Sequence, residues 1–227
     1  MDDTDAAAAE PNWAMQLIAR VERHDPPSHT AVCEAAATAV ARLLADPRRT
    51  TDPTWQHPID QWLDGLYRKH VRRARGTRWQ QVPQLPGVTV EHRGAQLRAL
   101  VPTTLDAMPP EVAKLQLAGR DLDDPDERPH LDPQPGLLVV SIAPDPPLSW
   151  PKAAAAAGHC AQLAQDTMPP EALEAWAAAG FPAAVDHPDI WAWEERLTAG
   201  GVHVVDAGLT EVSSGTTTAV AQWTSPA

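Results

Sequence analysis

The sequence lacks the residue patterns that identify most metal, nucleotide and disulfide-bonded proteins. Its two cysteines, Cys33 and Cys160, form no Cys-x-x-Cys pair, so neither a zinc site nor a disulfide framework is indicated. Motifs for a nucleophile elbow, a phosphate-binding loop, a dinucleotide site and a zinc hydrolase are absent, and no two histidines lie four residues apart. We therefore expect no metal and no cofactor.

Signals for export or membrane insertion are also missing. The N-terminus, MDDTDAAAAEPN, is acidic and lacks the basic flank and apolar run of a signal peptide. No stretch approaches the roughly 18 apolar residues that a transmembrane helix needs. These absences predict a cytoplasmic protein with no membrane contact, in which both thiols are reduced.

Charge is distributed unevenly over the 227 residues. The formal net charge of −12 is by itself unfavourable for binding nucleic acid. Residues 1–120 hold 15 Lys and Arg against 14 Asp and Glu, whereas residues 121–227 hold 3 against 16. The first half is therefore nearly neutral and the second strongly acidic, so the distribution of charge is more informative than its sum.

A strand, a turn and a helix are predicted at the start of the second half. The apolar run at 137–142 is followed by a proline-rich turn and an alanine-rich segment that begins at Pro151. Proline suits the first position of a helix because its missing N–H has no partner there. Lys152 then lies in the first turn, where the helix dipole disfavours a cation. A lysine at this position calls for a specific partner.

A similar pattern occurs 120 residues earlier. A strand at 14–22 leads through Asp25-Pro26-Pro27, the counterpart of Asp145-Pro146-Pro147, into a helix that continues to about Ala45. Later helices carry a central tryptophan in each half, and a pair of strands follows at 86–102 and at 200–222. We infer an internal duplication of a unit ordered β-α-α-β-α-β-β; chance similarity between alanine-rich helices is the alternative. The two tryptophans are Trp62 and Trp176.

This order predicts the α/β fold class. We expect two related three-layer α/β/α units, each with a mixed sheet of roughly four strands and helices on both faces. The predicted organisation is a disordered tail (1–12), a first unit (13–107), a helix with an acidic, proline-rich linker (108–136) and a second unit (137–225).

Polar residues in the second unit match two motifs of a known family. Residues 151–160 read PKAAAAAGHC, with Lys152 and His159 seven residues apart, and residues 206–210 read DAGLT, ahead of Thr218. These stretches resemble the type II peptidyl-tRNA hydrolases of archaea and eukaryotes, which carry Gly-Lys-x-x-Ala-Gln-x-x-His-Ala, Asp-Ala-Gly-x-Thr and a threonine in the last strand. The resemblance covers residues 137 to about 223.

The resemblance implies hydrolysis of the ester that joins a peptide to tRNA, with release of the free tRNA. Asp206 would orient or deprotonate the attacking water, and Lys152 would neutralise an oxyanion or phosphate. Thr210 and Thr218 would hold the water or the carbonyl group. Read without the family, Lys152 is a solvated lysine whose surface partner is Asp206, and His159 is a packed or capping histidine.

Two positions depart from the family pattern. Pro151 replaces the glycine before the lysine, and Ala156 replaces the glutamine four residues after it. The family's activity is thought to rest on that glutamine, so its absence argues against full activity and leaves the fold prediction intact. The alternative prediction is a catalytically inactive module of the same fold that binds RNA or a protein. A third, a structural protein that interacts through its nine tryptophans, requires a large exposed apolar patch.

The first unit lacks both motifs, with Ala31 or Val32 in place of the lysine, but contains a basic stretch. Such a cluster, flanked by Tyr67 and Trp79, suits phosphate contacts and base stacking, and we assign it to tRNA binding together with His159. Alternatively, its charges keep an edge strand from aggregating or pair with the acidic second half. Six of the 18 Lys and Arg residues form the basic stretch: Arg68, Lys69, Arg72, Arg73, Arg75 and Arg78.

Because type II hydrolases are commonly dimeric, we expect a monomer that acts as a pseudo-dimer.

Overall fold

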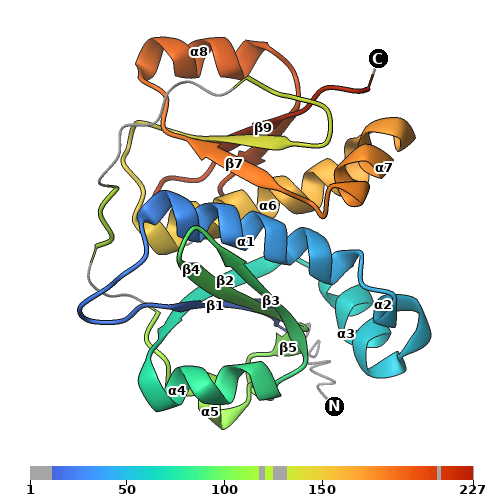
Figure 1. Ribbon diagram of the computed structural model, residues 1–227, viewed down its shortest axis with the longest axis vertical. Coiled ribbons are helices and arrows are strands. Elements are labelled where there is room, and N and C mark those ends of the chain that lie inside the picture. The colour runs from blue at the N-terminus through green and yellow to red at the C-terminus, as the bar shows by residue number, and fades with distance from the viewer. Residues whose placement is uncertain (1–11, 118–120, 125–131, 209–210, 227) are drawn as a thin grey trace, which may run out of the picture.

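The computed structural model describes residues 12–117, 121–124, 132–208 and 211–226 (Figure 1). Except for Asn12, the predicted N-terminal tail lies outside the described residues, as do parts of the predicted linker. None of the helices in the described part combines the length and apolar character that crossing a membrane requires.

The first unit is built on a mixed sheet whose main strands lie in the order β2-β1-β4-β3. Strand β1 pairs in parallel with β2 and antiparallel with β4 and β5. The strands are β1 (Trp13–Arg20), β2 (Arg68–Ala74), β3 (Gly87–His92), β4 (Ala95–Leu100) and β5 (Thr103–Thr104). The helices are α1 (His29–Leu44), α2 (Arg48–Thr51), α3 (Pro53–Leu63), α4 (Gly76–Gln81), the 3-10 turn η1 (Val82–Gln84) and α5 (Pro110–Ala113).

The second unit has the same strand order and pairing directions, β7-β6-β9-β8. Apart from the short elements α2, η1, β5 and α5 of the first unit, each unit follows the predicted order β-α-α-β-α-β-β. The α/β fold class with two related units is therefore confirmed, and the layout is consistent with duplication. The strands are β6 (Leu138–Ile142), β7 (Ala183–Asp186), β8 (Val202–Val205) and β9 (Thr217–Gln222), and the helices are α6 (Trp150–Thr167), α7 (Pro170–Ala178) and α8 (Ile190–Thr198).

The two central tryptophans make equivalent contacts. The indole Nε1 of Trp62 donates to the carbonyl of Arg68 at 2.9 Å, and that of Trp176 donates to the carbonyl of Pro182 at 2.8 Å. Each acceptor lies six residues after its tryptophan, where the next strand begins. Both indoles are almost fully buried, so each joins a helix to a strand. Each also meets an aromatic ring edge to face, on a residue of positive φ: Tyr67 and Phe181.

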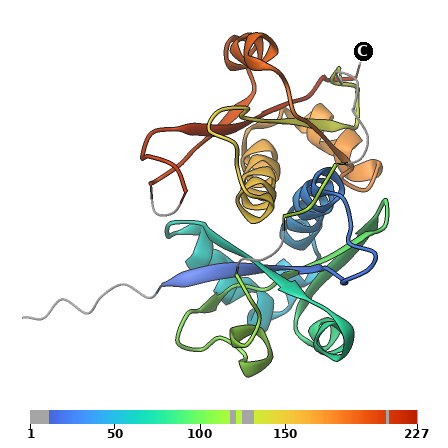
Figure 2. The same cartoon turned by 90° about the vertical axis from the view of Figure 1, so that its left-hand side faces the viewer.

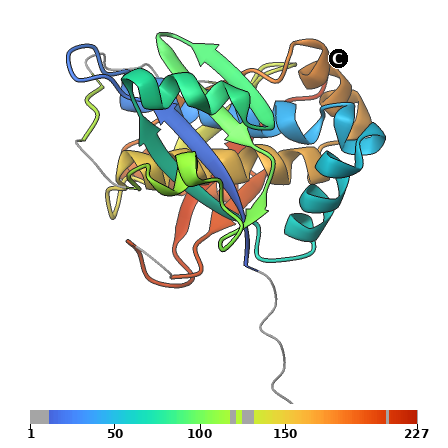
Figure 3. The same ribbon diagram turned by 90° about the horizontal axis from the view of Figure 1, so that it is seen from below.

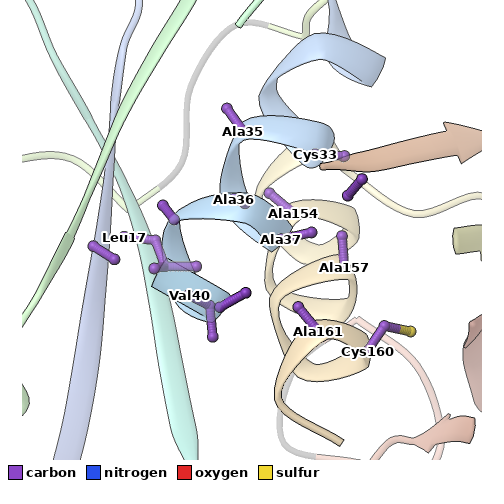
Figure 4. Packing of buried hydrophobic residues seen from close by; sticks show 14 of the residues in the cluster. Leu17, Cys33, Ala35, Ala36, Ala37, Val40, Ala154, Ala157, Cys160 and Ala161 are labelled. Atoms are coloured by element: carbon purple, nitrogen blue, oxygen red, sulfur yellow. The ribbon is translucent and has the colours of Figure 1, made fainter. Parts of the chain in front are cut away.

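Helices α1 and α6 lie side by side between the two sheets (Figures 1 and 2). Their contact is made largely by alanines, and each helix also carries a buried free thiol, Cys33 on α1 and Cys160 on α6 (Figure 4). Burial raises the pKa of both thiols. Small side chains let the helices pack closely, and one continuous hydrophobic core joins the two units.

The outer face of each sheet carries a smaller cluster of buried residues. Trp79 of α4 and Val82 of η1 pack on the first sheet. Helices α4 and α5 cover the outer face of this sheet (Figure 3). Trp193 of α8 packs on the second sheet against Val220. Helices therefore cover both faces of each sheet, as the sequence predicts.

Candidate functional site

A cleft of about 830 Å³ lies where the first unit meets the second. One wall is formed by residues 66–71, which include the start of β2, and the other by the face of α6 between Pro151 and Leu163. The end of β8 and the two residues that follow it, Asp206 and Ala207, also line the cleft. Its lining therefore comes from both units.

Lys152 and Asp206 form an ion pair in this cleft. Lys152 lies in the first turn of α6, and Asp206 directly follows β8. The second carboxylate oxygen, Oδ1 of Asp206, accepts from the amide of Gly208 at 2.7 Å. The side chains are only 15% and 13% exposed. The unfavourable position of Lys152 at the helix N-terminus is thus balanced by a carboxylate held in a fixed orientation.

The N-terminus of α6 has a second acidic partner that the sequence did not reveal. Oε2 of Glu211 accepts from the amide of Ser149 at 3.0 Å, and its Oε1 accepts from the Ser149 hydroxyl at 2.5 Å. A carboxylate at this end of a helix interacts favourably with the dipole. Glu211 also lines the cleft, but no local pattern relates it to Ser149, which lies 62 residues earlier.

The two candidate threonines have different outcomes. Thr218 lines the cleft, but it is 1% exposed and its hydroxyl donates to the carbonyl of Val204 at 3.2 Å. This bond ties β9 to β8 and occupies the hydroxyl proton. Thr210 lies outside the described residues. Of the two candidate threonines, the one that the structure describes supports the strands beneath Asp206.

Lys69 of the first unit reaches His159 of the second. Its Nζ lies 3.0 Å from Nδ1 of His159 and 2.5 Å from Oε1 of Gln162, and 4.6 Å from the ring centroid of Trp62. Burial holds the pKa of Lys69 well below its usual range, against the opposing effects of Cys160 and Asp166. Lys69 is thus a buried side chain in the cleft wall rather than a solvated surface lysine.

A glycine makes this contact possible. A Cβ added to Gly158 would lie 3.1 Å from Cγ2 of Val40 and 3.3 Å from Cδ of Lys69. These distances are shorter than ordinary van der Waals contacts, so a side chain would displace the stem of Lys69. Gly158, next to His159, lets β2 approach α6 closely.

The remaining basic residues of β2 and its continuation are divided between different environments. Arg68 lines the cleft with Lys69. Arg72 is buried on the other face of the sheet, where its guanidinium donates to Gln16 and to the carbonyl of Leu115. Its hydrogen bonds thus serve the interior of the protein. A second cavity, of about 650 Å³, is lined by Arg73, Arg75 and Arg78.

Ala156 lines the cleft at the position of the family's glutamine and is buried. It lies one turn after Lys152 and about one turn before His159, so the three residues share a face of α6. Gln162 also lines the cleft, but its carbonyl oxygen accepts from Lys69. The polar group that the family has at 156 is therefore not replaced by this nearby glutamine.

The corresponding contact in the first unit is chemically different. Counting from the paired tryptophans, Ala183 of β7 corresponds to Lys69 of β2. Helix α1 meets β7 through Glu34, which is buried and accepts from the amide of Val185 at 3.1 Å and from Nε2 of His92 at 2.8 Å. The contact of α1 with β7 thus uses a carboxylate, whereas the contact of α6 with β2 uses a histidine and a lysine.

The pH dependence of stability should reveal the burial of His159. Burial, assisted by Lys69 and Lys152, holds the pKa of His159 well below its usual range. The unfolded chain takes up this proton near pH 6.5 and the folded protein does not, so the folded state loses stability as pH falls below about 6.5. The free energy of unfolding should fall by up to about 1.4 kcal/mol per pH unit from this residue alone.

Urea unfolding at several pH values between neutrality and about pH 5.5 measures this loss. His29 and His70, whose pKa values are also lowered by burial, add losses of the same sign. The His159→Gln variant should therefore retain a pH dependence, but a smaller one than the wild type. Identical pH profiles for the two proteins would contradict the prediction.

The fold and the cleft define an α/β protein of two related units with a charged site between them. Comparison with models of protein families, with curated proteins and with solved structures found no match for this chain. Its function must therefore be inferred from the cleft itself and from the motifs that lie in it.

Proposed function

We propose that the cleft hydrolyses the ester bond between peptide and tRNA in peptidyl-tRNA and releases the free tRNA. The observation that carries the proposal is that Arg68, at the start of the basic strand of the first unit, and the Lys152–Asp206 pair of the second unit line one cleft. A substrate that contains both a phosphate backbone and an ester requires a cation for the backbone and an acid–base pair for the ester. The cleft volume of about 830 Å³ suits the terminal nucleoside with its esterified amino acid.

The chemistry assigned to each residue follows from its hydrogen-bonding capacity. The carboxylate of Asp206 only accepts, so it can orient a water and take its proton as the water attacks the ester carbon. Lys152 only donates, and it lies where the oxyanion or a phosphate would need a positive charge. Arg68 lines the opposite wall and would bind the backbone of the tRNA end.

The second cavity provides a separate group of basic residues. Arg73 lies near the other end of β2, about 17 Å from Arg68 by the rise of a strand, and Arg75 and Arg78 follow it in the chain. Clusters this far apart suit phosphates separated along the tRNA rather than neighbouring ones. We also propose a cytoplasmic location and a monomer in which the two units act as the subunits of a dimer would.

Ala156 favours a second candidate function, a module of the same fold that binds tRNA without cleaving it. With alanine at this position, α6 presents no side-chain amide one turn after Lys152. Substrate binding by Arg68 would be retained, whereas hydrolysis would be weak.

The experiment is a hydrolysis assay on N-acetyl-aminoacyl-tRNA, a minimal peptidyl-tRNA, with tRNA binding measured in parallel. We expect hydrolysis by the wild type and faster hydrolysis by Ala156→Gln. Binding without hydrolysis in both proteins would reject the enzyme and support the binding module. Neither binding nor hydrolysis would reject both functions.

A further inference from the structure

The contact between Lys69 and His159 bears on which nitrogen of the imidazole carries the proton. Two of the groups around Nζ of Lys69 are acceptors: the Oε1 of Gln162 at 2.5 Å and the electron-rich face of Trp62. The third neighbour, Nδ1 of His159, is 3.0 Å away. As an ammonium, Nζ has three N–H groups and no lone pair, so with two of them directed to Gln162 and Trp62 the third faces Nδ1, which then acts as an acceptor.

The proton of the neutral ring then lies on Nε2. Burial favours the neutral form of His159, which carries one N–H. The hydrogen bonds within the described residues leave Nε2 of His159 without a protein partner, and His159 lines the cleft. The ring is therefore able to give a hydrogen bond to a ligand.

The position of His159 suits such a role. It lies two turns after Lys152 on the same helix face, with the small side chain of Ala156 between them. A carbonyl oxygen in this space would have the Lys152 ammonium on one side and the His159 N–H on the other. A neutral imidazole is an established kind of donor to a carbonyl that becomes negatively charged.

We propose that Lys69, from the first unit, holds His159 in its neutral Nε2–H tautomer, and that this N–H donates to the carbonyl oxygen of the ester bound in the cleft. Lys69 is then a positioning residue and His159 a catalytic one. The catalytic part rests on the proposed function, whereas the tautomer does not. The first unit thus completes the site of the second.

The tautomer is measured in the intact wild-type protein by nitrogen NMR after ¹⁵N labelling of histidine, with His159 assigned by the His159→Gln variant. We expect Nδ1 in the range of unprotonated nitrogen and Nε2 in the range of protonated nitrogen. Lys69→Met should shift population towards the Nδ1–H form, and Lys114→Met, a change of an exposed lysine, should not. A proton on Nδ1 in the wild type would overturn the proposal, and so would an unchanged tautomer in a folded Lys69→Met protein.

The donor role is tested with an N-acetyl-aminoacyl adenosine in which an amide replaces the ester, so that it binds without being cleaved. Its addition should shift the Nε2–H resonance of His159, and His159→Ala should lower kcat by about 10²–10³-fold with little change in KM. A bound analogue that leaves this resonance unmoved would overturn the donor role. Wild-type protein that shows the expected tautomer and shift but no hydrolysis would reject the proposed function, while the tautomer and the donor contact would stand.

Discussion

Replacing Lys152 with methionine should reduce the hydrolysis of peptidyl-tRNA by about 10²–10³-fold in kcat, the usual cost of removing one group that stabilises an oxyanion. Methionine keeps much of the side-chain length and removes the charge. The ammonium of Lys152 lies in the cleft beside Asp206, and its side chain is only 15% exposed. A positive charge acts more strongly in such a partly buried site than it would in water. The measurement is single-turnover hydrolysis of N-acetyl-aminoacyl-tRNA.

A matched control is available because the chain has three lysines, Lys69, Lys114 and Lys152. Lys114→Met changes an exposed lysine outside the cleft and should leave the rate unaltered. Asp206→Asn should cost a similar factor to Lys152→Met, and the double variant little more, because residues that act as a unit have non-additive effects. Full activity in a stably folded Lys152→Met protein would exclude the mechanism.

Truncating either central tryptophan should lower the free energy of unfolding by about 3–5 kcal/mol, but only Trp62→Ala should also impair the site. Trp62 and Trp176 are both almost fully buried, and each donates to a strand carbonyl six residues later. Trp62 alone has the amine of Lys69 over its ring. Their structural roles therefore match, while their relation to the cleft differs.

Urea unfolding gives the stability of the two variants, and hydrolysis measured well below their unfolding midpoints gives the activity of folded molecules. We expect similar losses of stability, with reduced activity in Trp62→Ala and near wild-type activity in Trp176→Ala. Equal activities per folded molecule would show that the ring of Trp62 does not support Lys69. A much smaller loss of stability in one variant would show that the two tryptophans are not equivalent.

Much of the fold follows from local sequence. Apolar runs, proline-rich turns and alanine-rich helices repeat in the same order, and the repeat predicted two related sheets. Trp62 and Trp176 already marked corresponding helices. Within the site, Lys152 and Asp206 were identified from family motifs and lie together in the structure.

The parts that sequence reasoning missed depend on how the two units pack. The contact of Lys69 with His159 joins residues 90 positions apart, and no local pattern specifies it. The sequence prediction assigns the whole basic stretch to one binding surface, although side chains alternate between the two faces of a strand. Alternation places Arg72 on the opposite face from Lys69, where it bonds to Gln16. Period-two reasoning on residues 68–74 would have separated the two in advance.

The shared layer formed by α1 and α6 has a consequence for how such a site can change. In a homodimer, every substitution appears in both copies of the site, so an alteration that improves one cleft is imposed on the other. Two related units in a single chain are free of that constraint. Here β2 carries Lys69 where β7 carries Ala183, and α1 carries the buried Glu34 on the opposite side. Covalent linkage thus permits one half to specialise as scaffold while its neighbour retains the chemistry.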